Sequence, residues 1–215
     1  MKFYWVKTNA IIKKIFSNYI WDLPNGENKI YLTFDDGPTP EITNWILAHL
    51  DKHRVKATFF CIGNNIDQNP ELFNRLIDGG HSIGNHTYDH VNGWKSQVGP
   101  YIENVQRCED SILKQSGGRH LKATLFRPPY GQIKLRQSSR LIKDGYRIVM
   151  WDVLSADFDT SISPEECLQN VLTNLSSGSV VVFHDSVKAF RNLEYVLPRV
   201  LDFIKEKGFR CEPIR

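Results

Sequence analysis

The sequence predicts a single α/β domain with a parallel sheet. Apolar runs rich in β-branched residues alternate with segments of helical periodicity, which is the pattern of parallel strands joined by helical crossovers. The composition agrees, because 41% hydrophobic and 24% charged residues are typical of a globular domain of 215 residues. Both an open doubly wound sheet and a barrel fit this alternation. No dinucleotide loop or P-loop follows a strand, which weakens the nucleotide-binding versions.

The expected elements follow one another along the chain. Strands are expected at residues 29–35, 56–62, 81–86, 123–127, 146–152 and 179–184, with a short one near 209–213. Helices are expected at about 41–53, 70–79, 98–116, 133–144, 164–176 and 192–207. Two helix starts carry clear signals: Thr39 before Pro40, and Ser163 before Pro164 with Glu166 three residues after the cap.

Residues 1–28 are expected to form a short N-terminal arm packed on the main domain, which covers residues 29–215. Apolar residues recur at helical spacing between lysines, at Ile11, Ile12, Ile15, Phe16 and Tyr19. This pattern predicts a short helix on the main domain, with a membrane-surface helix as the alternative. Lysines at positions 7, 13 and 14 interrupt every apolar run, so we expect no signal peptide or membrane span and favour a cytoplasmic location.

The charge and cysteine content narrow the class of partner. The formal charge of +3 is mild and the basic residues are scattered, so nucleic-acid binding is not expected. Cys61, Cys108, Cys167 and Cys211 lie far apart with no CxxC pair, which favours reduced structural thiols over a zinc knuckle or a disulfide framework. We expect a monomer.

Polar residues collect where the predicted strands end. The stretch KIYLTFDDGPTPE runs from a strand into Asp35 and Asp36, and adjacent carboxylates are costly to bury unless they are paired or bind a metal. A plain turn is the alternative reading. The other predicted strands end in HSIGNHTYDH, FRPPYG, WDVLSAD and SVVVFHD. Since strand C-termini share one rim in parallel barrels, these groups are expected to meet there.

His86 and His90 have the spacing H-x-x-x-H, which lets both bind one metal if the chain turns helically after the strand. A carboxylate from a neighbouring strand end would be a third ligand and would leave a coordination position open, as catalytic sites require. The second acid could then take a proton from the attacking water. Two histidines and a carboxylate suit zinc better than Mg²⁺ or Ca²⁺, with Co²⁺ or Ni²⁺ as alternatives.

These motifs occur together in a known family. TFDDGP, HTYDH, FRPPYG, the tryptophan-acid segment at 151–158 and VVVFHD appear in order, and over residues 29–212 the chain resembles the polysaccharide deacetylases of carbohydrate esterase family 4. The resemblance implies a distorted (β/α)7 TIM-like barrel. It also implies a metal-dependent hydrolase that removes acetyl groups from N-acetylated, or O-acetylated, saccharides.

The resemblance also implies roles for individual residues. The implied metal ligands are Asp36, His86 and His90. Asp35 resembles the general base, and Arg127 the arginine that orients this base and favours its ionised form.

The remaining implied roles concern the leaving group and the acetyl group. His184 resembles the general acid, with Asp157 as its charge partner, and the backbone N–H of Tyr130 resembles the oxyanion donor. The residues implied to line the acetyl pocket are Pro128, Trp151 and Val182.

Two positions depart from the family pattern and bear on the substrate. Leu154 stands where the family often has an acid, and Phe158 where it usually has a tryptophan. The substrate groove is therefore expected to differ from that of typical members. Two further hypotheses stay open at this point: hydrolysis of another C–N bond, such as that of a cyclic amide or imide, and a catalytically dead sugar-binding module. Chitin oligomers, peptidoglycan, a capsule precursor and an O-acetylated glycan are all candidate substrates.

Overall fold

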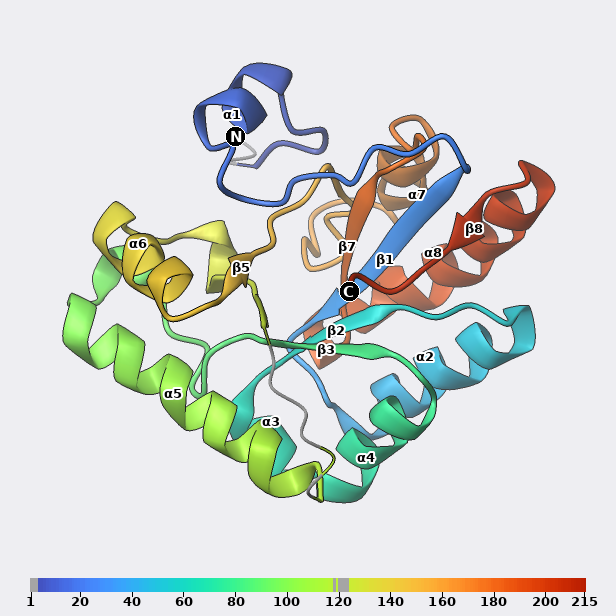
Figure 1. The fold of residues 1–215 in the computed structure, drawn as a ribbon. Coiled ribbons are helices and arrows are strands. Elements are labelled where there is room, and N and C mark those ends of the chain that lie inside the picture. Colours follow the sequence, from blue (N-terminus) through green and yellow to red (C-terminus); the bar gives the residue numbers. More distant parts are fainter. Residues whose placement is uncertain (1–3, 118, 120–123) are drawn as a thin grey trace.

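A parallel sheet, curled into a distorted (β/α)7 barrel, forms the centre of the molecule (Figure 1). The computed structural model describes residues 4–117, 119 and 124–215. The strands are β1 (Lys29–Asp35), β2 (Thr58–Cys61), β3 (Ser82–Asn85), β4 (Leu125–Phe126), β5 (Arg147–Ile148), β6 (Val153–Leu154), β7 (Val180–His184) and β8 (Arg210–Cys211). Their order is β5-β4-β3-β2-β1-β7-β6, all parallel, with β8 pairing the start of β1.

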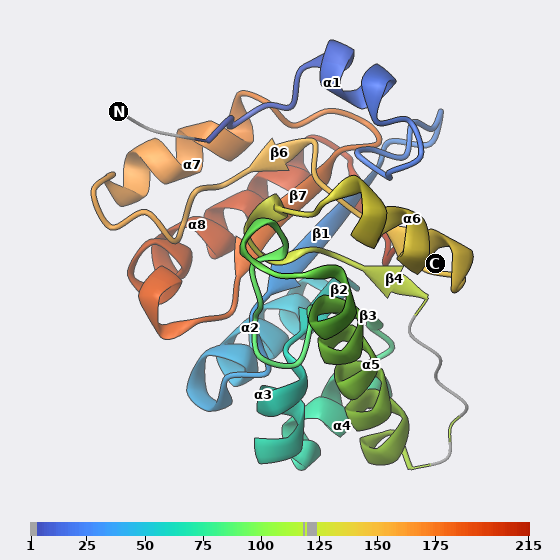
Figure 2. The same ribbon diagram turned by 90° about the vertical axis from the view of Figure 1, so that its left-hand side faces the viewer.

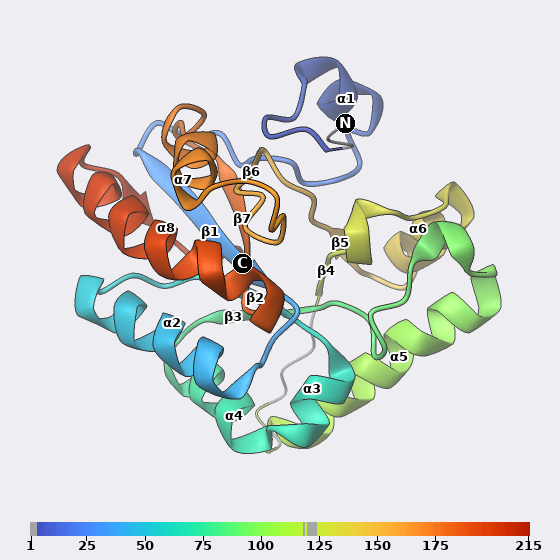
Figure 3. The ribbon, with the colours of Figure 1, turned by 180° about the vertical axis from the view of Figure 1, so that it is seen from behind.

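Helices cover the outside of this sheet, as Figure 3 shows from behind. They are α1 (Ala10–Ile15), α2 (Pro40–His53), α3 (Gly63–Gln68), α4 (Pro70–Asp78), α5 (Val98–Gln115), α6 (Leu135–Lys143), α7 (Pro164–Leu172) and α8 (Val187–Glu206). Two short 3₁₀ turns, η1 (Gly93–Lys95) and η2 (Pro129–Gly131), lie in loops that follow strands β3 and β4. In the described part of the chain, no helix has the length and apolar character needed to cross a membrane.

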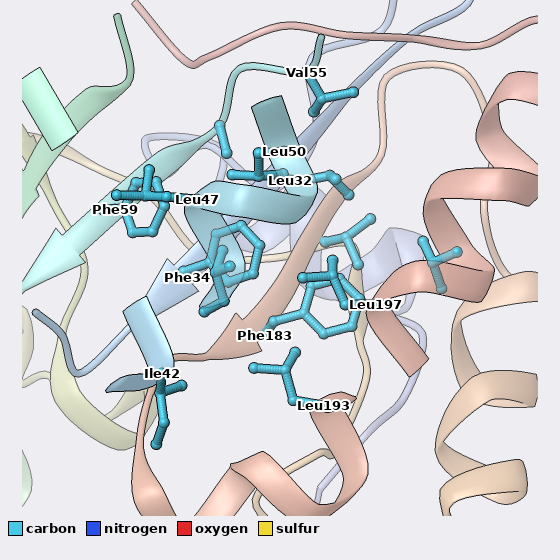
Figure 4. Close-up of a cluster of buried hydrophobic side chains, with 14 of the residues drawn as sticks. Leu32, Phe34, Ile42, Leu47, Leu50, Val55, Phe59, Phe183, Leu193 and Leu197 are labelled. Carbon is cyan, nitrogen blue, oxygen red and sulfur yellow. The ribbon is translucent and has the colours of Figure 1, made fainter. Parts of the chain in front are cut away.

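The main core lies between the central strands and helices α2 and α8 (Figure 4). Phe34 of β1 stacks between Phe59 of β2 and Phe183 of β7, with ring centroids 5.0 and 5.8 Å away. Leu47 of α2 and Leu197 of α8 cover these strands and are almost fully buried. Each such side chain contributes about 1.5–3 kcal/mol by leaving water. The core therefore holds the C-terminal ends of the central strands in fixed positions.

The two outermost strands, β5 and β6, do not pair with each other, and the N-terminal arm lies between them (Figures 1 and 2). On one side Ile20 donates its N–H to Ile148 at 2.8 Å and accepts one from Met150 at 2.7 Å. On the other side Val6 accepts from the N–H of Leu154 at 2.8 Å. The arm thus satisfies backbone groups on both open edges of the sheet.

Apolar side chains of the arm divide between the protein and the solvent. Ile12, Phe16 and Tyr19 pack against a second buried cluster that includes Phe126 and Ile148. Ile11 and Ile15 are 66% and 64% exposed, so only some of the apolar residues at helical spacing in the arm pack against the domain.

The strand predicted at 146–152 exists only at Arg147–Ile148, because the rest of this segment crosses from β5 to a second strand, β6, that was not predicted. The chain leaves β5 after Ile148, meets Ile20 of the arm, and enters β6 at Val153 on the opposite edge of the sheet. The apolar residues 148–151 lead into Val153 with only Asp152 between them, and most of this stretch is buried, so the sequence pattern gives no sign of the crossing. The segment WDVLSAD therefore contains β6.

Three other predictions need correction. Helix α3 was not predicted, since its six residues, GNNIDQ, contain one large apolar side chain, Ile66, and so show no apolar period. Helix α8 begins at Val187 and not at 192. Thr39 precedes α2 but its side chain makes no capping bond, whereas Ser163 accepts from Glu166 N–H as expected.

The four cysteines are free thiols, three of them buried.

Candidate active site

The C-terminal ends of several strands open into one cavity of about 330 Å³. The predicted site residues that line it are Asp35, Asp36, His86, His90, Pro128, Tyr130, Trp151, Val182 and His184. Arg127 and Asp157 are fully buried behind this lining, each against one of the lining residues. The predicted meeting of strand ends is therefore found, with these two residues as support for the lining.

Asp35, the last residue of β1, is 4% exposed and pairs with Arg127. One guanidinium nitrogen donates to Asp35 Oδ1 and to Thr33 Oγ1, both at 2.7 Å. The other guanidinium nitrogens donate to the carbonyls of Val149 and Met150. Because the cation is fixed by these bonds, it holds the Asp35 carboxylate in one orientation at the cavity wall.

Asp36 leaves the strand in a left-handed conformation, with φ of 84°. Successive strand residues point to opposite faces, so this bend is what brings both carboxylates to the same cavity. Asp36 Oδ1 is buried without a hydrogen-bond partner, and lies 3.3 Å from His90 Nε2 and 3.7 Å from His86 Nε2. A buried unpaired carboxylate oxygen is costly, so a bound cation would remove the cost.

The two histidines are arranged as metal ligands would be. Donor atoms of Asp36, His86 and His90 lie within 4.8 Å of one another. His86 Nδ1 donates to the Arg127 carbonyl at 2.7 Å, which leaves the lone pair on Nε2, facing Asp36. Burial, helped by the nearby His90, lowers the pKa of His86 to about 3. Burial also lowers the pKa of His90, against the opposing charges of Asp36 and Asp35. Metal binds the neutral form of imidazole, so Asp36, His86 and His90 fit the divalent metal that the family resemblance implies.

Helix α5 holds the loop that carries the histidines. Asn104 Oδ1 accepts the backbone N–H groups of Tyr88 and Asp89 at 2.8 and 3.0 Å. Thr87 Oγ1 accepts from Val91 N–H and so spans His90. Thr87 and His90 have φ of 64° and 55°, conformations that cost about 1–3 kcal/mol each and persist only where the surroundings impose them. The supporting role of Asn104 had no signal in the sequence, because its partners lie 15 and 16 residues away.

His184, at the end of β7, is bound twice by the fully buried Asp157. Asp157 Oδ1 contacts His184 Nδ1 at 2.7 Å, and Oδ2 accepts the backbone N–H of His184 at 2.8 Å. Burial alone lowers the pKa of His184, but the charge and hydrogen bond of Asp157, with Asp36 and Asp35, outweigh it and raise the pKa to about 9. His184 is thus a cation at neutral pH, with Nε2 free to donate a proton.

An apolar recess adjoins these polar groups. Trp151, Val182 and Leu154 line it, and Leu154 is 4% exposed. Gly131 has φ of +65°, and a Cβ there would come within 2.4 Å of the Trp151 ring, so the glycine of FRPPYG gives this ring its space. Tyr130 is also left-handed, with φ of 62°, and its side chain is 61% exposed.

Two further residues outside the predicted set, Asp185 and Tyr4, join distant segments at the site. Asp185 is fully buried and accepts from Gly37 N–H at 2.8 Å and from Thr43 Oγ1 at 2.6 Å, which fixes the turn after Asp36. Burial raises the pKa of Asp185 to about 7, and the Thr43 hydrogen bond opposes that shift. The other is Tyr4 of the arm, which lines the cavity. The Gly37–Asp185 hydrogen bond and the hydrogen bond from Tyr4 to Asp159 each join segments more than 140 residues apart. No local sequence pattern reveals such partners.

A barrel rim that carries a paired carboxylate, a paired imidazolium and a ligand set for a metal defines a hydrolase-type site. The family described as polysaccharide deacetylase matches residues 22–149. A peptidoglycan-N-acetylglucosamine deacetylase of Bacillus cereus is 35% identical over 193 residues, which are 89% of this chain and 69% of the relative. A chitooligosaccharide deacetylase of Azorhizobium caulinodans is 29% identical, over 89% of this chain and 95% of the relative.

Solved structures agree with the sequence comparisons. The crystal structure of a peptidoglycan N-acetylglucosamine deacetylase, in complex with 4-naphthalen-1-yl-N-oxidanyl-benzamide, superposes with a TM-score of 0.87 at 31% identity. The match covers 96% of this chain and 95% of that one. The chain belongs to the polysaccharide deacetylase family, carbohydrate esterase family 4.

Proposed function

We propose that the protein is a metal-dependent deacetylase of N-acetylated saccharides. The observation that carries this proposal is the buried, unpartnered Asp36 oxygen, which faces two imidazole nitrogens in the same cavity as Asp35 and His184. The similarity to enzymes named for N-acetylglucosamine and chitooligosaccharide substrates supports the same reaction class. O-acetylated saccharides are a second substrate class, because the same groups would serve an ester.

Asp36, His86 and His90 would hold one divalent transition metal, with zinc proposed and Co²⁺ or Ni²⁺ as alternatives. When bound, the ion would polarise the acetyl carbonyl and make the attacking water more acidic. Asp35, oriented by Arg127, takes a proton from the attacking water while the water oxygen forms a bond to the acetyl carbon. The N–H of Tyr130 is proposed to donate to the oxygen that becomes negative.

The second half of the reaction breaks the carbon–nitrogen bond. His184 donates its Nε2 proton to the leaving nitrogen, so that acetate and a free amine result. Asp157 stabilises the imidazolium before this transfer and holds the ring toward the cavity. Pro128, Trp151 and Val182 are proposed to enclose the acetyl methyl group, which an apolar recess accommodates without unpaired polar atoms.

We propose the division of the chain into an arm at residues 1–28 and a catalytic domain at 29–215, with the arm acting as a brace between β5 and β6. The monomeric state and the cytoplasmic location stay predictions. Size-exclusion chromatography with light scattering tests the first, and fractionation of the source cells tests the second.

Acetate release is the direct test of the proposed function. Metal is removed with a chelator, and acetate is measured on N-acetylglucosamine oligomers, peptidoglycan and an O-acetylated xylan, before and after addition of Zn²⁺ or Co²⁺. We expect acetate from at least one N-acetylated saccharide, only with metal restored. Exposed Asp89 lies between the two histidines, so Asp89→Asn is the matched control for Asp36→Asn. Release of ammonia or ring-opened product from a cyclic imide alone would favour the other C–N hydrolase. No hydrolysis of any substrate would favour a binding module.

A further inference from the structure

We propose that Tyr4 of the N-terminal arm is part of the saccharide-binding groove and contacts the sugar unit next to the one that is deacetylated. This inference rests on the proposed function and names a residue that determines which saccharide length the site prefers. Tyr4 lines the same cavity as Asp35, His86 and His184, although it lies far from them in the sequence.

Hydrogen bonding and ring packing fix the position of Tyr4. Its hydroxyl donates to Asp159 Oδ2 at 2.6 Å. Its ring meets the Phe158 ring edge-on, with centroids 5.5 Å apart, and Phe158 meets His184 in the same way at 5.1 Å. Tyr4 is thus separated from the proposed general acid by one aromatic ring. A ligand group that touches Tyr4 lies beyond the sugar whose nitrogen receives the proton.

The arm that carries Tyr4 is fastened to the barrel directly beside the acetyl recess. Asp152, which is 2% exposed, accepts from Lys7 Nζ at 2.6 Å and from Lys13 Nζ at 2.5 Å. Thr8 Oγ1 donates to the carbonyl of Trp151 at 2.7 Å, and Leu154 donates its N–H to Val6. Because Trp151 and Leu154 are recess residues, the arm and the recess share one rigid frame.

The exposed part of the Tyr4 side chain indicates the chemistry of its ligand. Its hydroxyl is already bound to Asp159, so the surface left for a ligand is the carbon ring. Aromatic rings in a wet groove suit the apolar face of a sugar ring, as they suit any flat group with a polar rim. Phe158 continues this apolar wall, and the Lys188 ammonium lies 5.8 Å from its ring centroid at the cavity edge. The groove therefore favours oligosaccharides over single sugars.

The test compares three variants on substrates of different length. Tyr4→Ala removes the ring, Tyr4→Phe keeps the ring without the hydroxyl, and Trp5→Ala changes the adjacent aromatic residue, which is 64% exposed. For each protein, KM and kcat are measured on the monomer and tetramer of N-acetylglucosamine. Titration calorimetry gives the Kd of the tetramer on the same zinc-loaded samples. Circular dichroism and bound zinc confirm that each variant is folded.

In Tyr4→Ala we expect the KM advantage of the tetramer over the monomer to shrink about tenfold, as a loss of about 1.4 kcal/mol requires. Its kcat on the tetramer falls less than its KM rises. Tyr4→Phe keeps most of the advantage, and Trp5→Ala behaves as wild type. Equal values in Tyr4→Ala and Trp5→Ala, or equal losses in Tyr4→Phe and Tyr4→Ala, would overturn the proposal.

Calorimetry separates a failure of the Tyr4 proposal from a failure of the proposed deacetylase function. If the wild-type protein binds the tetramer but releases no acetate, the proposed function fails while the Kd values still test Tyr4. If the wild-type protein binds no tetramer, the Tyr4 proposal fails as well.

Discussion

The left-handed conformation of Asp36 decides what two adjacent carboxylates can do at the end of β1. Asp35 stays in the strand and faces Arg127, whereas Asp36 turns toward His86 and His90. One carboxylate is thereby neutralised by a fixed cation, and the other is left with an oxygen that has no partner. Two residues of the same type thus acquire different chemistry from backbone geometry alone.

Conservative substitution of each acid should therefore give different defects. Asp35→Asn keeps the three proposed ligands, so we expect full zinc occupancy with activity reduced by about 10²–10⁴-fold, the usual contribution of a general base. Asp36→Asn should lose zinc affinity by more than the roughly 10–100-fold seen when only an outer-shell partner is removed. Zinc stoichiometry by mass spectrometry and acetate release measure the two defects. Loss of zinc in Asp35→Asn with retention in Asp36→Asn would show that the roles are exchanged.

His184 should set the alkaline side of the rate profile. Because its pKa is raised to about 9, the imidazolium persists well above neutral pH and is lost as the pH passes 9. We expect kcat/KM on an N-acetylated saccharide to fall above about pH 9, and His184→Ala to lose activity by about 10²–10⁴-fold together with that alkaline limb.

Ester substrates provide the control for His184. An alkoxide leaves more readily than an amide anion, so His184→Ala should reduce O-deacetylation less than N-deacetylation. The same raised pKa means that the His184–Asp157 pair stabilises the fold fully below pH 6.5, and that this contribution is lost as the pH rises through 9. A His184→Ala variant with the wild-type alkaline limb would exclude His184 as the acid.

At the scale of the element, the N-terminal arm depends on one buried carboxylate. Asp152 lies between Lys7 and Lys13, whose side chains are 38% and 20% exposed. Asp152→Asn removes the buried charge that both ammonium groups contact, although Lys13 keeps Asp22 and Lys7 keeps the Asn174 carbonyl. We therefore expect a loss of about 1–3 kcal/mol in the free energy of unfolding. Thermal and urea unfolding at pH 7 measure the change. Asp144→Asn, which removes an exposed i,i+4 pair with Arg140, is the matched control and should cost about 0.5 kcal/mol or less.

Acid should erase the difference between Asp152→Asn and wild type. Burial raises the pKa of Asp152, but hydrogen bonds from Lys13, Lys7 and Ser179 outweigh it and hold the pKa below 3.8. A carboxyl with a lowered pKa stabilises the fold above its unfolded pKa, and this contribution is lost as the pH falls through the folded value. The difference between the two proteins should therefore begin to narrow only as the pH falls below 3.8, and should disappear once the pH is below the lowered pKa of Asp152. A difference that does not narrow at any pH below 3.8 would contradict the ion-pair explanation.

Secondary-structure elements differ in how well the sequence predicts them. β1, β7 and α2 are close to their predicted ranges, because each combines a long buried pattern with a clear boundary such as Gly37-Pro38. β6 was missed because Val153–Leu154 follows the apolar run at residues 148–151 after a single polar residue, Asp152. α3 was missed because its helical form depends on packing against α5 and not on its own periodicity.

At the scale of the whole molecule, parallel topology explains why so much of the site could be predicted. All strands of the barrel end on one rim, so polar residues at strand ends must lie near one another wherever they occur in the sequence. This accounts for Asp35, His86 and His184. The support residue Asn104 has no such rule, because it lies within α5. The rule places Asp185 near the rim, since it follows β7 directly, but its partners Gly37 and Thr43 are set by the tertiary fold.

The arm closes a sheet whose two edges would otherwise present unpaired backbone groups. Val6 and Thr8 cover β6, and Ile20 covers the end of β5. The same segment carries Tyr4 to the cavity. The arm thus covers the open edges of the sheet and also supplies the residue proposed to extend the substrate groove.

This closure also imposes an order of events during protein synthesis. Lys7 and Asp152 are 145 residues apart, so a ribosome that adds about 5–20 residues per second produces the partner of the arm roughly 7–30 s after the arm itself. Throughout that interval the nascent chain carries Ile12 and Phe16 without the cluster that later covers them. The arm is therefore synthesised well before it can dock, and Tyr4 reaches its place in the cavity lining only when translation is well past β6.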